Sequence, residues 1–194
     1  MAEWGGFKMK KQEFNELKTE RLDLRPICLE PSFKIANSLF NLISNNRDFF
    51  KYMPWSDIKT PEQEYEFLQD AAAKWKNNKA ATYGLYLKGT NEYVGCCSVM
   101  NLSFSNSSCE IGYWLNPKHA KHGFMTEAVN AVAKEFYDRG AKRIVIKADI
   151  TNTNSRHVAE RCGFVCEGIA RQAEYYPATD TYGDVAIYAK IKEN

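Results

Sequence analysis

The sequence has no apolar run near the roughly 18 residues that a membrane-spanning helix requires. It also has no block of like charge, since 26 basic and 24 acidic residues leave a net charge of +2. A broad basic surface for nucleic acid is therefore not expected. The N-terminus lacks the layout of a secretory signal. We expect a soluble, cytoplasmic protein without a membrane or nucleic-acid partner.

Metal-site patterns are missing too. The chain has six cysteines and three histidines, but no CxxC pair and no doubled CxxC spacing of the kind that holds structural zinc. Cys96 and Cys97 lie in a strand-like run, and Cys162 lies on a helix-like face. We therefore expect no metal, and we expect these cysteines to be buried, reduced thiols.

The common phosphate-binding motifs GxxxxGK[ST] and GxGxxG are also absent. The sequence has instead the segment KHAKHGFMTEAV at residues 118–129. An apolar, strand-like run at residues 111–115 precedes it and ends at Asn116-Pro117. Beyond Gly123, apolar residues recur at helical spacing, at Met125, Ala128, Val129, Val132 and Phe136.

A strand, a glycine-containing turn and a helix start together predict an anion site. The first N–H groups of a helix have no partner within the helix, and the helix dipole adds partial positive charge there. Lys121 and His122 lie beside this point in the sequence. We expect the turn to bind a diphosphate.

The chain as a whole is interpreted as one domain at residues 19–194, after an N-terminal extension at residues 1–18. A helix crosses between the strands at 109–115 and 144–150, so these two should run parallel. The other pairs of neighbouring strands have short connections, so we expect them to be antiparallel. We expect strands at 19–27, 82–87, 93–100, 109–115, 144–150, 164–171 and 184–191, and helices at 36–43, 60–77, 124–139 and 154–163. An aromatic loop is expected at 49–55, and a polar, tyrosine-rich connection before the last strand.

Three segments carry a resemblance to a known family: YWLNP at 113–117, GFMTEA at 123–128 and NTNSRHVAERCGF at 152–164. Together they resemble the GNAT superfamily of N-acetyltransferases. The resemblance implies an α/β (α+β) GNAT fold: a mixed, mostly antiparallel sheet of about seven strands, a central parallel pair splayed around the cofactor, and helices on both faces. Ala120 and Met125 depart from the family's pattern in the phosphate turn.

Three further segments resemble the RimJ/RimL branch of ribosomal-protein N-terminal acetyltransferases. They are TERLDLRPI at 19–27, YMPW at 52–55, and RQAEY at 171–175 with the final strand. This resemblance implies acetyl-coenzyme A as cofactor and the N-terminus of a ribosomal protein, or a small amine, as acceptor. It also implies a homodimer.

Acetyl transfer to an amine needs a base, because an α-amino group has a pKa of about 8 and must be neutral to attack. It also needs a donor for the oxyanion of the intermediate and an acid for the leaving thiolate. The resemblance points to Glu174 as base, through a water, with Glu110 as the competing base. A solvated loop position is the alternative for Glu174. Ser155 is the candidate acid, and a helix N-cap is its alternative role. The oxyanion donor is expected among the backbone amides of residues 113–115.

The same resemblance assigns the binding residues. Asn152 and Asn154 are expected along the pantetheine, and Tyr52 and Trp55 at the acceptor, although the aromatic residues of that loop could equally form a hydrophobic plug. The remaining cofactor-binding candidates are Trp114, Leu115, His119, Lys121, His122, Gly123, Phe124, Met125 and Thr126.

Two other functions stay open on this evidence. One is acetylation of a small amine, such as an antibiotic, an aminoacyl-nucleotide or a polyamine. The other is a non-catalytic module that binds acyl-coenzyme A, which the departures at Ala120 and Met125 favour and the presence of Glu174 and Ser155 opposes.

Overall fold

The computed structural model describes residues 9–55, 57 and 60–193, and these residues form one sheet of eight strands in the order β1-β2-β3-β4-β5-β6-β8-β7. The strands are β1 (Leu17–Lys18), β2 (Leu22–Pro26), β3 (Ala81–Leu87), β4 (Tyr93–Ser103), β5 (Ser108–Leu115), β6 (Arg143–Asp149), β7 (Val165–Tyr176) and β8 (Thr181–Ile191). The helices are α1 (Phe33–Ser44), α2 (Arg47–Phe50), α3 (Pro61–Lys76), the 3-10 turn η1 (Pro117–His119), α4 (Phe124–Asp138) and α5 (Thr153–Arg161).

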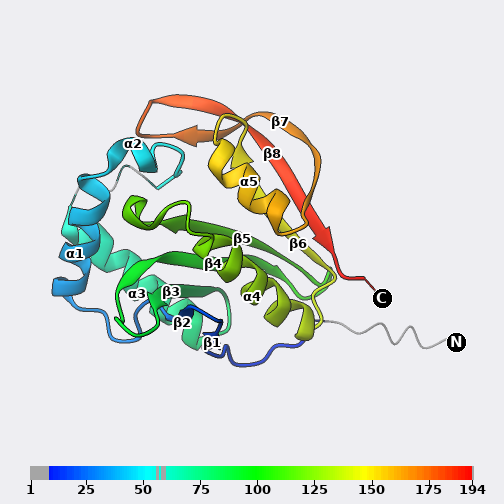
Figure 1. Ribbon diagram of the computed structural model, residues 1–194, viewed down its shortest axis with the longest axis horizontal. Helices are drawn as coiled ribbons and strands as arrows, with labels where there is room; N and C mark the ends of the chain where they lie inside the picture. Colours follow the sequence, from blue (N-terminus) through cyan, green and yellow to red (C-terminus); the bar gives the residue numbers. More distant parts are fainter. Residues whose placement is uncertain (1–8, 56, 58–59, 194) are drawn as a thin grey trace, which may run out of the picture.

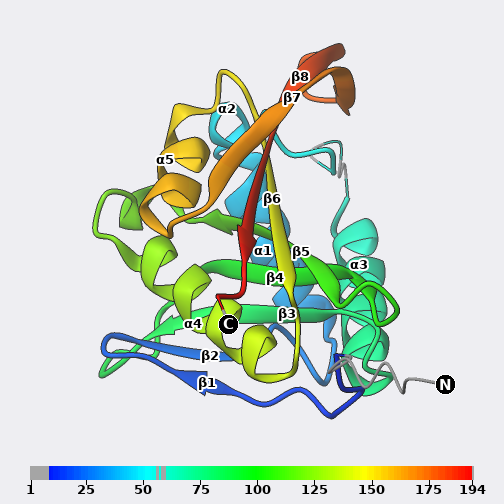
Figure 2. The ribbon, with the colours of Figure 1, turned by 90° about the vertical axis from the view of Figure 1, so that its right-hand side faces the viewer.

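Helices cover both faces of the sheet, as predicted (Figures 1 and 2). Figure 2 shows α4 and α5 on one face and α1 and α3 on the other. The apolar stripe of α4 packs on the first face, where Val129, Val132 and Phe136 are almost fully buried. On the other face, Phe50 and Trp114 belong to a second core beneath α1 and α3. The predicted mixed, mostly antiparallel sheet is thereby confirmed, with eight strands in place of about seven.

Two local predictions are wrong. The tyrosine-rich stretch before the last strand is largely strand, because β7 continues to Tyr176 and β8 begins at Thr181. The register between the two strands shifts at a bulge between Ala170 and Glu174, and pairing resumes beyond it. Within the bulge, Gln172 has a φ of +47°, and its N–H donates to Asp184 at 2.8 Å. The aromatic loop predicted at 49–55 overlaps the short helix α2, which ends at Phe50 and buries that residue.

Strands β5 and β6 form the one parallel pair in the described sheet, and they pair over a short length. Ser108, Cys109 and Glu110 are aligned with Arg143, Ile144 and Val145. Beyond these residues β6 pairs only with β8, up to Asp149. The carboxyl ends of β5 and β6 therefore diverge and leave room between them.

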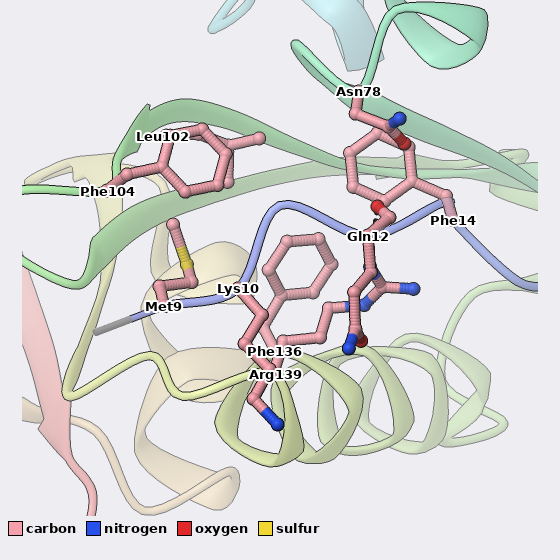
Figure 3. Close-up of a pocket in the computed structure, with 9 residues that line it drawn as sticks. All are labelled: Met9, Lys10, Gln12, Phe14, Asn78, Leu102, Phe104, Phe136 and Arg139. Carbon is pink, nitrogen blue, oxygen red and sulfur yellow. Dashed lines mark hydrogen bonds between the residues drawn. The ribbon is translucent and has the colours of Figure 1, made fainter. Parts of the chain in front are cut away.

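Residues 9–18, assigned above to an extension, pack against the domain (Figure 3). Met9 is buried, and Phe14 contacts Trp75 and Phe136 with ring centroids 5.3 and 5.9 Å apart. Arg139, at the end of α4, donates to the carbonyl oxygens of Gln12 and Glu13. This segment thus closes one end of the main core.

The cysteines expected to be buried are buried. Cys96, Cys97 and Cys162 are free thiols, and burial raises the pKa of Cys96 to about 12. Cys166 is the exposed one of the six. Within the described residues, no helix is long and apolar enough to cross a bilayer.

Candidate active site

A pocket of about 590 Å³ opens where β5 and β6 diverge. Its walls come from α2 and the residues after it, the end of β5, the turn before α4, and the start and inner face of α5. The lining residues are Asp48, Phe49, Tyr52, Met53, Tyr113, Trp114, Leu115, Ala120, Lys121, Gly123, Phe124, Met125, Thr126, Asn152, Asn154, Ser155, His157, Val158 and Arg161.

One end of the pocket is the turn between η1 and α4. Lys121 and Gly123 both have left-handed backbone, with φ of +67° and +79°. The first α-helical hydrogen bond runs from the N–H of Glu127 to the carbonyl of Gly123, at 3.0 Å. The N–H groups of residues 124–126 precede that bond, so they are free to meet an anion, and Lys121 adds a positively charged residue to the same lining.

Nine of the eleven predicted cofactor residues line this pocket; His119 and His122 do not. The imidazole of His119 faces Glu92 in the β3–β4 hairpin, with its Nε2 3.0 Å from the carboxylate. His122 contributes its backbone carbonyl to a contact with Arg21, and its ring lies near Phe124. The ring of His119 thus faces a residue that is distant in the sequence, whereas the ring of His122 lies beside its near neighbour Phe124.

Ser155 lies in the middle of the pocket, in the first turn of α5. The side chain of Asn152 accepts a hydrogen bond from the Ser155 N–H at 3.2 Å, so Asn152 is the N-cap. The hydroxyl of Ser155 lies 3.2 Å from that of Tyr113, which donates to the Ser155 carbonyl at 3.0 Å. Burial raises the pKa of Tyr113, so its phenol is neutral at physiological pH.

Tyr52 lies at the other end, where Thr151 links it to a buried carboxylate, that of Asp149. Its hydroxyl is 3.3 Å from Thr151 Oγ1, which donates to Asp149 Oδ1 at 2.5 Å. Asp149 also accepts from the Thr151 N–H at 2.8 Å and is 7% exposed. The ring of Tyr176 packs edge-on against Tyr52 at 6.3 Å. This end of the pocket therefore has a hydroxyl group, that of Tyr52, which Thr151 connects to the Asp149 carboxylate.

The two candidate bases lie outside the pocket lining. Glu174 is half-buried on β7, opposite Gly183. Burial raises the pKa of Tyr176, and the charges of Asp149 and Glu174 raise it further, so Glu174 lies near the Tyr52 end. Glu110 belongs to the last aligned residue pair before β5 and β6 diverge, and it forms an ion pair with Lys147 at 2.9 Å. Trp55 packs against Phe50, 5.9 Å between ring centroids.

Sequence reasoning missed several pocket residues. Arg161 could have been found, because Asn154, Val158 and Arg161 follow at helical spacing along one face of α5. The side chain of Tyr113 had no local signal, since its partner Ser155 lies on α5, 42 residues further along the chain.

The chain belongs to the GNAT acetyltransferase family, because residues 21–165 match the Acetyltransferase (GNAT) domain. It is 30% identical over 156 residues to the ribosomal-protein-serine acetyltransferase of Escherichia coli (strain K12), covering 79% of this chain and 85% of that protein. Both the family resemblance and the predicted enzyme class are thereby confirmed.

Two solved structures share the fold closely. The microcin C7 self-immunity acetyltransferase MccE, in complex with acetyl-CoA and AMP, has a TM-score of 0.78 and 30% identity, covering 89% of this chain and 93% of that one. RimL, the ribosomal L7/L12 alpha-N-protein acetyltransferase, in complex with coenzyme A, has a TM-score of 0.80 and 26% identity, covering 91% and 98%.

Proposed function

We propose that this enzyme transfers the acetyl group of acetyl-coenzyme A to the N-terminal α-amino group of a protein, with a ribosomal protein as the first candidate. The observation that carries the proposal is the single pocket that joins the turn at Lys121–Gly123 to Ser155 and Tyr52. Similarity to the ribosomal-protein-serine acetyltransferase and to RimL supports the choice of acceptor. The cytoplasmic location and the homodimer remain predictions.

The residues at the turn fit the cofactor. A diphosphate needs several N–H donors and positive charge, and residues 124–126 with Lys121 supply both. Arg161 adds a second cation on the facing helix. Asn152 and Asn154 add amide groups between these residues and the acceptor end, where they suit a pantetheine chain. Acetyl-coenzyme A supplies the acetyl group as a thioester.

Ser155 is the proposed acid. Its hydroxyl can hold a proton in the middle of the pocket and is oriented by Tyr113 at 3.2 Å. The Ser155 hydroxyl donates to the Tyr113 hydroxyl, and Tyr113 donates in turn to the Ser155 carbonyl, so the two groups fix each other's orientation. The N-cap role predicted as the alternative belongs to Asn152.

Glu174 is the proposed base, acting through a water. Support comes from its place beside Tyr176, which packs on Tyr52 in the pocket wall. Glu110 stays the competing base, but its carboxylate is held by Lys147 and by Asn101 at 3.1 Å. Both contacts are to Oε2, and they fix the direction of this carboxylate.

Charge in the pocket favours a peptide terminus over a polyamine. Of the lining residues that the structure describes, Asp48 is the one carboxylate, whereas Lys121 and Arg161 are cations. Aromatic side chains from Phe49 to Phe124 make up much of the wall. A polycation would need several carboxylates, and an uncharged peptide backbone does not.

The second candidate acceptor is an aminoacyl-nucleotide. The observation that favours it is the 30% identity to MccE, whose structure holds AMP together with acetyl-CoA. An aromatic wall and nearby cations also suit a nucleotide base and its phosphate.

Release of free thiol from acetyl-coenzyme A tests these acceptors against each other. The panel contains peptides with N-terminal serine or alanine from ribosomal proteins, aminoacyl-nucleotide analogues, polyamines and aminoglycosides. Turnover limited to the peptides supports the proposal. Turnover only with a small amine overturns the protein acceptor, and tight cofactor binding without turnover supports a binding module.

The choice of base is tested with Glu174→Gln and Glu110→Gln in the same assay. We expect Glu174→Gln to lower kcat by about 100-fold or more, the usual size for loss of a general base, with little change in KM. Equal activity of this variant and the wild type, with loss in Glu110→Gln, would reverse the assignment.

A further inference from the structure

The turn before α4 needs an outside support. Two residues in left-handed backbone, Lys121 and Gly123, stand within three positions of each other. This conformation costs about 1–2 kcal/mol for a residue with a side chain, so Lys121 adds to the free energy of forming the turn. The N–H groups of the turn must nevertheless point steadily into the pocket to bind an anion.

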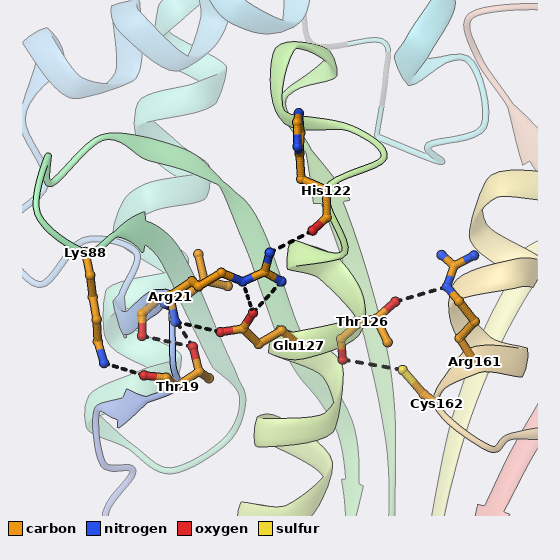
Figure 4. A network of polar contacts seen from close by, with 9 residues as sticks. Thr19, Arg21, Lys88, His122, Thr126, Glu127, Arg161 and Cys162 are labelled. Atoms are coloured by element: carbon orange, nitrogen blue, oxygen red, sulfur yellow. Dashed lines mark hydrogen bonds and ion pairs between the residues drawn. The ribbon is translucent and has the colours of Figure 1, made fainter.

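Arg21 supplies that support from the start of β2 (Figure 4). Its guanidinium donates to the carbonyl of His122 at 2.9 Å and to Glu127 at 2.7 Å, and it stacks over the ring of Phe124 at 4.7 Å. The backbone N–H of Arg21 also donates to Glu127, at 2.9 Å. One side chain thus contacts the turn, the first helical residue and the first turn of α4.

The contact with His122 fixes the direction of one peptide group. All peptide bonds in the described chain are trans and planar, so the N–H of Gly123 points opposite to the carbonyl of His122. That carbonyl points at Arg21, so the Gly123 N–H points away from Arg21. Gly123 and Lys121 both line the pocket.

Arg21 acts here through geometry more than through charge. Its cation is paired with Glu127, whose side chain is 16% exposed. Burial alone would raise the pKa of Glu127, but hydrogen bonds from Thr19 and Arg21 lower it below the usual value. The pair is therefore ionised and nearly neutral as a unit, so its field on a bound anion is small.

We propose that Arg21 is a positioning residue for the diphosphate of the cofactor: it holds the peptide between His122 and Gly123 so that the turn's N–H groups face the pocket. The inference rests on the proposed function for the identity of the ligand. No step of the reaction passes through Arg21.

The test is the affinity of the protein for coenzyme A and for pantetheine, measured by calorimetry without any acceptor. Pantetheine lacks the diphosphate and the nucleotide. We expect Arg21→Ala to weaken coenzyme A binding about tenfold or more, the size of one lost charge-assisted hydrogen bond, and to leave pantetheine binding unchanged. Arg21→Lys keeps the charge but lacks the planar set of N–H donors of the guanidinium, so this variant should lose most of the same affinity for coenzyme A.

Arg25→Ala is the matched control. Arg25 lies in β2, four residues after Arg21, and its side chain stacks over Tyr86 at 3.9 Å and bonds to Asn91, away from the turn. We expect it to bind both ligands as the wild type does. A loss in this variant equal to that in Arg21→Ala would overturn the proposal, because the effect would then belong to β2 as a whole.

Other outcomes are equally clear. Unchanged coenzyme A affinity in Arg21→Ala, full rescue by Arg21→Lys, or equal weakening of both ligands would each overturn the positioning role. A wild type that binds coenzyme A no more tightly than pantetheine would instead overturn the assignment of the turn, and the proposal for Arg21 with it.

Discussion

The two ends of α4 are each held by an arginine, in opposite surroundings. At the N-terminal end, Arg21 reaches from β2 to the carbonyl of His122 and pairs with Glu127. At the C-terminal end, Arg139 reaches out to the carbonyls of Gln12 and Glu13 and pairs with Glu135. The side chain of Arg21 is 44% exposed and that of Arg139 is 5% exposed.

This difference separates a support for function from a support for the fold. A buried guanidinium cannot lose its partners without leaving polar groups unpaired, so Arg139 contributes to stability. An exposed one is compensated by water when it is removed, so the loss of Arg21 changes the shape of the turn more than the stability of the domain. Arginine thus stabilises the fold at the C-terminal end of α4 and shapes the turn at its N-terminal end.

The largest effect is expected for Arg139→Ala. The change leaves Glu135 and two carbonyl oxygens without their donor, which should lower the free energy of unfolding by about 3–5 kcal/mol. Urea unfolding measures it, and coenzyme A affinity below the transition should stay at the wild-type value. The control is Lys134→Ala on the same helix, whose exposed pair with Asp138 should change the free energy of unfolding far less than Arg139→Ala does. Equal effects in the two variants would remove the distinction drawn here.

The next effect is the dependence of stability on pH. Neither arginine titrates in the neutral range, so another group must cause it. Glu64 on α3 does: it is 2% exposed, its Oε2 has no partner among the described residues, and burial raises its pKa to about 7. The native state holds this proton more tightly than the unfolded chain. Its contribution to stability is therefore complete below the ordinary value of 4.5 and is lost as the pH rises through about 7.

We expect the wild type to lose about 2–3 kcal/mol of stability between pH 5 and 8, and Glu64→Gln to remove most of that loss. Unfolding in urea at several pH values measures it. Arg21→Ala and Arg139→Ala should keep the wild-type slope. A Gln variant whose stability fell in parallel with the wild type would place the titrating group elsewhere.

A smaller effect compares the glycines at the two ends. Gly123 and Gly140 both have left-handed backbone, with φ of +79° and +97°. Alanine at either position should lower the free energy of unfolding by about 1–2 kcal/mol, because a side chain disfavours this conformation. Only Gly123→Ala should also weaken coenzyme A binding. Equal binding losses in both variants would mean that the helix as a whole, and not its first turn, controls affinity.

The smallest effect is the stability of Arg21→Ala itself. Its ion pair is partly exposed, so the variant should lose about 1 kcal/mol or less of the free energy of unfolding, seen as a small decrease in the midpoint of thermal unfolding. Differential scanning calorimetry beside Arg139→Ala gives the contrast directly. A loss as large as that of Arg139→Ala would make Arg21 a support of the fold and not of the turn.

Much of the fold could be predicted from local patterns. Apolar spacing predicted α4, and the helices expected at 60–77 and 124–139 agree with α3 and α4 to within one residue at each end. Where prediction failed, a distant partner was responsible. The bulge at Gln172 depends on Asp184, and the helix α2 depends on the core that receives Phe50.

By itself, the sequence determined the elements, the family and the turn that faces the pocket, because periodicity and turn chemistry act over a few residues. Only the tertiary structure decided which side chains meet there. Arg21 and Glu127 are 106 residues apart, and Tyr52 and Thr151 are 99 apart. A local pattern says which face a residue occupies, but its partner across the sheet is set by how all the strands pair and pack.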